Sequence, residues 1–135
     1  MAAESAYDYA VIRVVPRVER GELINVGVIL SCPEVEFLEA AIEIDESRLL
    51  ALDPGLDLDA VRAHLSTIPL VCRGGAAAGP IGALPHRSRF HWLVAPRSTI
   101  IQMSSVHTGR TSNPARLLQR LIDQLVKPPS PRSVS

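Results

Sequence analysis

The order of hydrophobic and polar positions predicts three strands in the first third of the chain. Residues 7–15 and 23–32 contain runs of apolar residues at consecutive positions, such as Ala10-Val11-Ile12, which are typical of strands buried on both faces in the interior of a sheet. Residues 37–44 alternate instead, with Glu39 and Glu43 on the side opposite the apolar residues, as in a strand with one face in water. The connections between these strands are short, and short connections favour antiparallel pairing.

The middle and the end of the chain show helical patterns. Asp45 can cap a short helix that ends at residue 52, and a longer helix begins near Asp57. Pro69 is expected to kink or break this longer helix near Ile68, because proline lacks the backbone donor that a helix interior needs. A third helix over residues 114–126 starts at Asn113-Pro114, a capping side chain followed by proline. The apolar stripes of the two longer helices are Leu58, Val61, Leu65, Ile68 and Cys72, and Leu117, Leu118, Leu121, Ile122 and Leu125.

Residues 90–95 and 99–106 are apolar enough to predict two further strands, joined by the hairpin-like link Pro96-Arg97-Ser98. The elements then follow the order β-β-β-α-α-β-β-α. This order predicts an α+β fold with a mostly antiparallel sheet and with helices packed on one face. Residues 1–127 form one such domain, and the Pro/Ser-rich tail of residues 128–135 is expected to be disordered.

Composition agrees with a globular domain, but the charge is unevenly spread. The formal net charge is zero, yet residues 1–60 hold thirteen acidic side chains and four Arg, whereas residues 61–135 hold ten basic side chains and one acid, Asp123. Either the two halves interleave their charges on one surface, or the molecule has a basic face for an anionic partner. Cys32 and Cys72 show no metal-type spacing and fit reduced thiols better than a disulfide. Without a secretory signal or an apolar run of about 20 residues, the expected location is cytoplasmic.

The segment from Arg87 to Arg110 is the richest in side chains that bind ligands. A metal site is not predicted, because the spacing of His86, His91 and His107 matches no compact motif. A nucleophilic site would pair Ser98 or Ser104 with a histidine, but the segment contains no acid to complete it.

An anion site is better supported than a nucleophilic one. Arginines flank hydroxyl groups along this segment, and arginine suits bidentate recognition of phosphate or carboxylate. Nucleic acid is not expected as a ligand, since the chain has one Lys and no recognised motif, although Trp92 or Phe90 could stack on a base. Asn25, inside an apolar strand, either makes a structural hydrogen bond or lines the same site together with Glu22. The candidate binding residues are Glu22, Asn25, Arg89, His91, Trp92, Arg97, Ser98, Thr99, His107 and Arg110.

Several segments resemble a bacterial family known as domain of unknown function 3037. They are residues 7–16 (Tyr-x-Tyr-Ala-Val-Ile-Arg-x-Val-Pro), residues 20–28 (Arg-Gly-Glu-x-Ile-Asn-Val-Gly-Val), residues 90–99 (Phe-His-Trp-Leu-x-Ala-Pro-Arg-Ser-Thr) and residues 106–109 (Val-His-Thr-Gly). The resemblance brings no catalytic residues with it. It implies a partner, because members of this family are often encoded beside proteins with a HipA-like kinase domain. Pro69 departs from the regular helix that the resemblance implies.

The sequence therefore predicts a small binding or accessory module, with no cofactor, that partners or regulates a HipA-like kinase protein or binds a phosphate- or carboxylate-bearing ligand. The alternative is a small hydrolase or transferase that uses His91, His107, Ser98 and Arg97. An enzyme of this kind should bring a histidine, a nucleophile and an anion-binding arginine together in one pocket.

Overall fold

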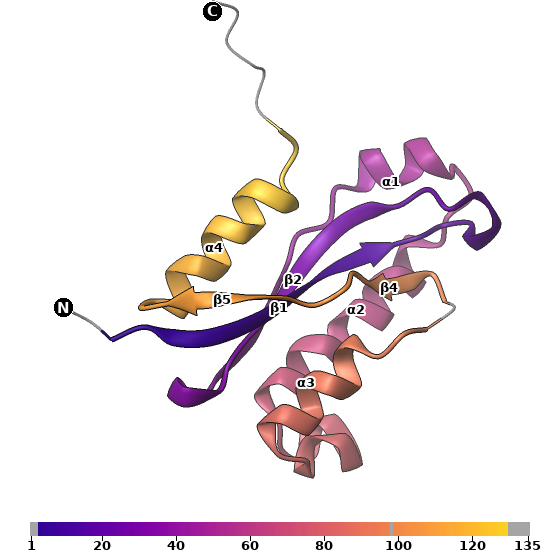
Figure 1. Ribbon diagram of the computed structural model, residues 1–135. Coiled ribbons are helices and arrows are strands. Elements are labelled where there is room, and N and C mark those ends of the chain that lie inside the picture. The colour runs from indigo at the N-terminus through magenta and orange to yellow at the C-terminus, as the bar shows by residue number, and fades with distance from the viewer. Residues whose placement is uncertain (1–2, 98, 130–135) are drawn as a thin grey trace, which may run out of the picture.

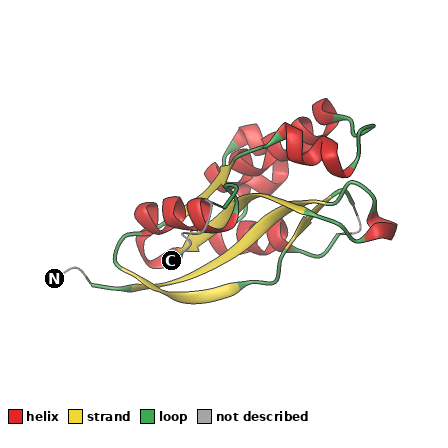
Figure 2. Ribbon diagram, turned by 90° about the horizontal axis from the view of Figure 1, so that it is seen from above, coloured by secondary structure: helices red, strands yellow, loops and turns green. Residues whose placement is uncertain are grey.

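The computed structural model describes residues 3–97 and 99–129, and within them the chain forms one five-stranded antiparallel sheet (Figure 1). β1 (Ser5–Val14) and β2 (Ile24–Cys32) pair with each other in its interior, as their apolar faces predict. β3 (Phe37–Ile42) pairs with β2. β4 (Ile101–Met103) and β5 (His107–Thr111) both pair with β1, one near each end. Figure 2 shows the long strands running side by side.

The helices begin where capping side chains are placed. Asp45 accepts a hydrogen bond from Arg48 N at the start of α1 (Glu46–Leu52), and Asn113 accepts one from Arg116 N at the start of α4 (Pro114–Leu125). Asp57 caps α2 (Leu58–Arg73) in the same way. The other helices are α3 (His86–Val94) and the short 3₁₀ segments η1 (Val18–Arg20), η2 (Pro33–Val35) and η3 (Ala76–Ala83).

The expected break at Pro69 does not occur, since α2 continues to Arg73. Buried residues lie on both sides of the proline, Leu65 and Ile68 before it and Val71 and Cys72 after it. Burial of this stripe against the sheet offsets the hydrogen bond that Pro69 removes.

The α+β class and the antiparallel sheet are confirmed, but the helices do not share one face of the sheet. Ile29 on β2 belongs to a core cluster with α1, α2 and α3, whereas its neighbours Val28 and Leu30 belong to a second cluster with α4. Successive residues of a strand point to opposite faces. α4 therefore covers the face opposite the other helices. Because β2 is apolar on both faces, both faces of the sheet must be covered. The prediction that all helices pack on one face did not take this into account.

The predicted hairpin of residues 90–95 and 99–106 is wrong. Residues 86–94 form α3, in which Phe90 and Leu93 are buried at helical spacing, while Trp92 and His91 are exposed. Only residues 101–103 of the second predicted strand form β4, and β5 was not predicted because its residues are polar. Of the expected disordered tail, Pro128 and Pro129 lie outside helices and strands, and residues 130–135 lie outside the described part of the chain.

Candidate functional site

A pocket of about 230 Å³ lies between α2, the end of α3 and the segment leading into β4. Its wall carries polar and cationic groups of His64, Thr67, Arg97 and Thr99, together with the indole of Trp92. Apolar side chains complete the lining: Ile68, Leu93, Ile100, Ile101 and Met103. Three of the predicted candidate residues, Trp92, Arg97 and Thr99, are thus brought together here. Ser98 lies outside the described residues.

Arg97, which lines this pocket, is held in place by the end of α3. Its guanidinium lies over the Trp92 ring, 4.6 Å from the ring centroid. The same group donates to the carbonyl oxygens of Trp92 at 2.8 Å and Leu93 at 3.4 Å. The last carbonyls of a helix lack partners within the helix, so Arg97 caps α3 while remaining exposed. Trp92 is 39% exposed, which is unusual for the only tryptophan of a small domain.

Arg89 has a structural position instead. It donates to the carbonyl oxygens of Val71 at 2.9 Å, Cys72 at 2.6 Å and Leu84 at 3.0 Å. A cation at the C-terminal end of α2 satisfies orphan carbonyls and opposes the helix dipole. Arg89 thereby joins α3 to α2, and this guanidinium is already occupied.

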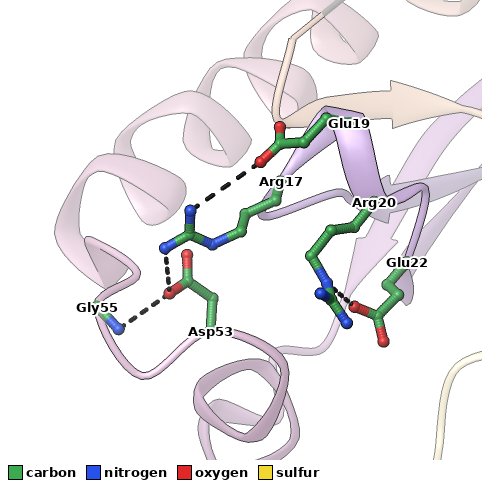
Figure 3. A network of polar contacts seen from close by, with 6 residues as sticks. All are labelled: Arg17, Glu19, Arg20, Glu22, Asp53 and Gly55. Carbon is green, nitrogen blue, oxygen red and sulfur yellow. Dashed lines mark hydrogen bonds and ion pairs between the residues drawn. The ribbon is translucent and has the colours of Figure 1, made fainter.

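The candidates from the first third of the chain also have structural partners. Asn25 donates to the carbonyl oxygen of Leu125 at 3.0 Å, which ties β2 to the end of α4. Its side-chain oxygen accepts from Arg13 at 3.4 Å. Glu22 forms an ion pair of 2.5 Å with Arg20 in the connection between β1 and β2 (Figure 3). Neither residue lines the pocket beside Trp92.

Figure 3 shows that this connection is held to the loop between α1 and α2 by charged groups. Arg17 lies 3.8 Å from Asp53 and 4.0 Å from Glu19, and Asp53 also accepts from the backbone N–H of Gly55 at 3.1 Å. The Arg17 side chain is more than half exposed, so water screens these pairs and they contribute little stability. The arrangement fixes a loop and offers no reactive group.

The histidines do not converge. His91 lies on the exposed side of α3, and His107 lies on β5 with its ring stacked on Tyr9 at 5.0 Å. The hairpin that would have brought them together is absent, because residues 86–94 are helical. Arg110, also on β5, donates to the carbonyl oxygen of Glu4 at 3.0 Å.

Ser104, a candidate nucleophile, is a structural residue. Its hydroxyl accepts from the backbone N–H of Val11 at 2.8 Å and donates to the carbonyl oxygen of Ser105 at 2.8 Å. It thus replaces a backbone partner of β1 between β4 and β5. The side chain is buried, so no substrate reaches it.

A serine–histidine contact exists elsewhere. Ser31 Oγ lies 2.7 Å from His86 Nε2 at the start of α3. Burial lowers the pKa of His86, and the nearby Arg89 and Arg87 lower it further. Ser31 is completely buried, so this pair does not present a nucleophile to a substrate. The thiols are equally inert: both cysteines are free and buried, and burial raises the pKa of Cys72 to about 12.

Sequence reasoning missed His64 and Thr67. Both lie on α2 beside the buried stripe, on the side that faces Trp92. Their spacing of three places them on one helical face. The spacing is visible in the sequence, but it does not show that the two residues face a pocket, because that depends on the position of α3.

Among the described residues, no group of three or more His, Cys, Asp or Glu side chains is arranged to hold a metal ion. In the same part of the chain, every helix is too short or too polar to cross a lipid bilayer.

Comparison with known proteins identifies one family. Residues 9–126 match the model of the family described as protein of unknown function (DUF3037). No curated protein and no solved structure matched the chain. Since the match covers most of the chain, from the middle of β1 to the end of α4, the chain belongs to the DUF3037 family.

Proposed function

We propose that the chain is a binding or accessory module that receives an anionic group of a partner protein in the pocket beside Trp92. The observation that carries this proposal is the exposed Trp92 with the Arg97 guanidinium over its ring. Tryptophan and arginine are the residues that most often dominate the binding energy of protein interfaces.

The chemistry of the pocket favours a carboxylate or phosphate group on an otherwise apolar segment. Arg97 uses some of its five N–H donors on the carbonyls of α3, and the others remain for a ligand. His64 adds a further polar group, and Ile68, Leu93 and Met103 supply apolar contact. The Thr99 hydroxyl already donates to the carbonyl oxygen of Ile101 at 2.7 Å. Of the described lining residues, none is acidic, so nothing in this wall repels an anion.

The same groups support an enzyme less well. A hydrolase or transferase with a serine nucleophile needs a serine, a histidine and an acid in one pocket. Among the described residues, the lining contains one histidine and no serine or acid, and Ser31 and Ser104 are buried elsewhere. Ser98, the serine of the alternative enzyme, lies outside the described residues.

The partner that we propose is a HipA-like kinase protein, on the basis of the gene neighbourhood that the family resemblance implies. Such a protein would supply a structured surface and, through its phosphoryl chemistry, phosphorylated side chains. A phosphorylated segment would meet Arg97 through charge-assisted hydrogen bonds.

Co-purification of the chain with a HipA-like kinase protein from the same organism tests this proposal. Trp92→Ala should abolish or strongly reduce recovery of the kinase, because it removes the platform on which Arg97 lies. Leu84→Ala is the matched control, since Leu84 is also a large apolar residue, 38% exposed, and it does not line the pocket. Recovery that is equal for the wild type and both variants would contradict the assignment of the pocket. A wild-type chain that fails to recover the kinase would contradict the choice of partner.

A further inference from the structure

A row of aromatic rings lies on the face of the sheet that carries α4. Tyr7 and Tyr9 are two residues apart on β1 and therefore point to the same face. Tyr9 is paired across the sheet with His107 of β5, and the two rings are stacked with centroids 5.0 Å apart and planes 24° apart. The Tyr7 and Tyr9 rings are 6.2 Å apart at 27°. The three rings form a continuous stack, which we call the aromatic row.

The glycine of β5 belongs to the same arrangement. Gly109 is paired with Tyr7, and a Cβ at this position would collide with the Tyr7 ring. Glycine therefore allows the ring to lie flat over β5. Tyr7 and Tyr9 are partly buried against α4, whereas His107 is exposed at the outer end of the row. The free face of the His107 ring is thus the position at which another flat ring could extend the stack.

Positive charge lies at the end of the same strand. Arg116 and Arg120, one turn apart on α4, line a hollow of about 310 Å³ together with the hydroxyl residues Thr111 and Ser112. Both arginines are exposed, and neither guanidinium lies within 4.0 Å of a carboxylate in the described part of the chain. Like charges one helical turn apart repel each other, so an anion between them would relieve this repulsion.

The aromatic row and the arginine hollow are connected by β5. His107 and Thr111 are four residues apart, which corresponds to about 13 Å along a strand. α4 follows directly on β5 and lies beside it (Figure 1). A ligand that reaches both features must carry a flat ring at one end and negative charge at the other, and it must at least span the part of β5 between His107 and Thr111, where the hollow begins. Stacked nucleotides advance by about 3.4 Å each, so this distance spans several nucleotides and exceeds one.

We propose that the aromatic row and the arginine hollow bind single-stranded nucleic acid, with a base stacked on His107 and phosphates at Arg116 and Arg120. Aromatic platforms beside basic grooves bind single strands because every base has a stacking face and every linkage a charge. A duplex keeps its bases stacked internally and cannot offer one to His107. The sequence argued against nucleic acid because it contains one lysine and no known motif. The aromatic row cannot be seen in the sequence, because it depends on the pairing of β1 with β5, about a hundred residues later.

Fluorescence anisotropy with a labelled oligonucleotide of about ten nucleotides tests the proposal, since single-strand sites span roughly 4–16 nucleotides. The purified full chain should bind the oligonucleotide, and His107→Ala should weaken binding by about 5- to 150-fold, the range for loss of one base–aromatic stack. His107→Phe should restore most of the affinity, because a phenyl ring keeps the stacking face. A duplex of the same length should bind more weakly.

Separate variants test the contribution of the arginine charges to nucleic-acid binding. The double variant Arg116→Ala/Arg120→Ala should weaken binding and reduce the slope of affinity against salt by about 1.4, because each phosphate contact to a single strand contributes about 0.7. The double variant Arg17→Ala/Arg20→Ala removes two exposed arginines at the opposite end of β1 and should leave both quantities unchanged. No measurable binding by the wild type, equal binding of duplex and single strand, or an unchanged affinity of His107→Ala would overturn the proposal. Thermal unfolding of each variant is measured as well. A variant that unfolds at the same temperature as the wild type is folded, so its loss of affinity is a loss of binding.

Discussion

At the scale of single residues, the polar side chains of this domain fall into two groups: those occupied by the fold and those left free. Arg89, Asn25 and Ser104 each satisfy a backbone group of a neighbouring element. Arg97 satisfies backbone carbonyls as well, but it remains exposed beside Trp92. A sequence shows that a residue can bind something and does not show that the fold already binds it. Some of the ten candidate residues, such as Asn25 and Arg89, therefore already have hydrogen-bond partners within the fold.

Ser104 provides a test of this distinction. Ser104→Ala should lower the free energy of unfolding by about 1–3 kcal/mol, because it leaves the buried N–H of Val11 without its acceptor. Ser105→Ala, at the exposed neighbouring position, should change it by less than about 0.5 kcal/mol. Urea unfolding measures both, and equal values for the two variants would show that the Ser104 hydroxyl does not support β1.

His86 provides a second test, through pH. Its pKa in the folded chain is lowered from the usual 6.5, so the unfolded chain binds the proton more readily. The contribution of neutral His86 is fully present above pH 6.5 and is lost as the pH falls below 6.5 towards the lowered pKa. The urea midpoint should therefore fall between pH of about 7.5 and about 5.5.

The matched variants isolate this contribution from other acid effects. His86→Gln should show a smaller fall in the midpoint over this range, whereas His64→Gln, which changes an exposed histidine, should follow the wild type. A fall of equal size in all three proteins would exclude His86 as its cause.

At the scale of elements, the sequence predicted those with a strong period or a clear cap. The apolar runs of β1 and β2 and the Asn113-Pro114 start of α4 are all found in the structure. α3 was mistaken for a strand because Phe90 to Val94 is short, apolar and aromatic, and such runs suit either structure. Tertiary contacts decide for the helix: Arg89 reaches the end of α2, and Phe90 and Leu93 enter the core together.

The candidate site depended on this mistaken element. A strand would have placed Trp92 on the same side as Phe90, whereas the helix buries Phe90 and exposes Trp92. β5 could not be predicted because His107 to Thr111 has no apolar pattern; its place follows from pairing with β1.

The docking of α4 is tested by a core substitution. Leu121 is 7% exposed and lies in the cluster between α4 and β2. Leu121→Ala should destabilise the domain by roughly 2–5 kcal/mol, because it removes buried surface and leaves a cavity. Gln124→Ala, on the exposed side of the same helix, serves as the control. Thermal unfolding that is unchanged in Leu121→Ala would contradict packing of α4 on the sheet.

At the scale of the whole molecule, the acidic first half and the basic second half interleave. Arg87 of α3 pairs with Asp8 of β1 at 2.8 Å, and Arg62 of α2 pairs with Glu46 of α1. Two arginines of the second half thus pair with carboxylates of the first half, which is the kind of contact that the simpler of the two sequence interpretations expects. Arg97 beside Trp92, and Arg116 and Arg120 on α4, are exposed, and the two proposals concern these three arginines.

The central claim is that the pocket beside Trp92 binds a partner, and calorimetric titration of the proposed partner, a HipA-like kinase protein, into Arg97→Ala tests it most directly. Arg110→Ala is the matched control, because Arg110 is also exposed and also donates to a backbone carbonyl, but it does not line the pocket. Arg97→Ala should weaken binding by about 1–3 kcal/mol, as expected for loss of a charge-assisted hydrogen bond, while its thermal unfolding stays close to that of Arg110→Ala. Loss of stability in Arg97→Ala with unchanged affinity would show instead that Arg97 only caps α3, and the pocket would no longer qualify as the binding site.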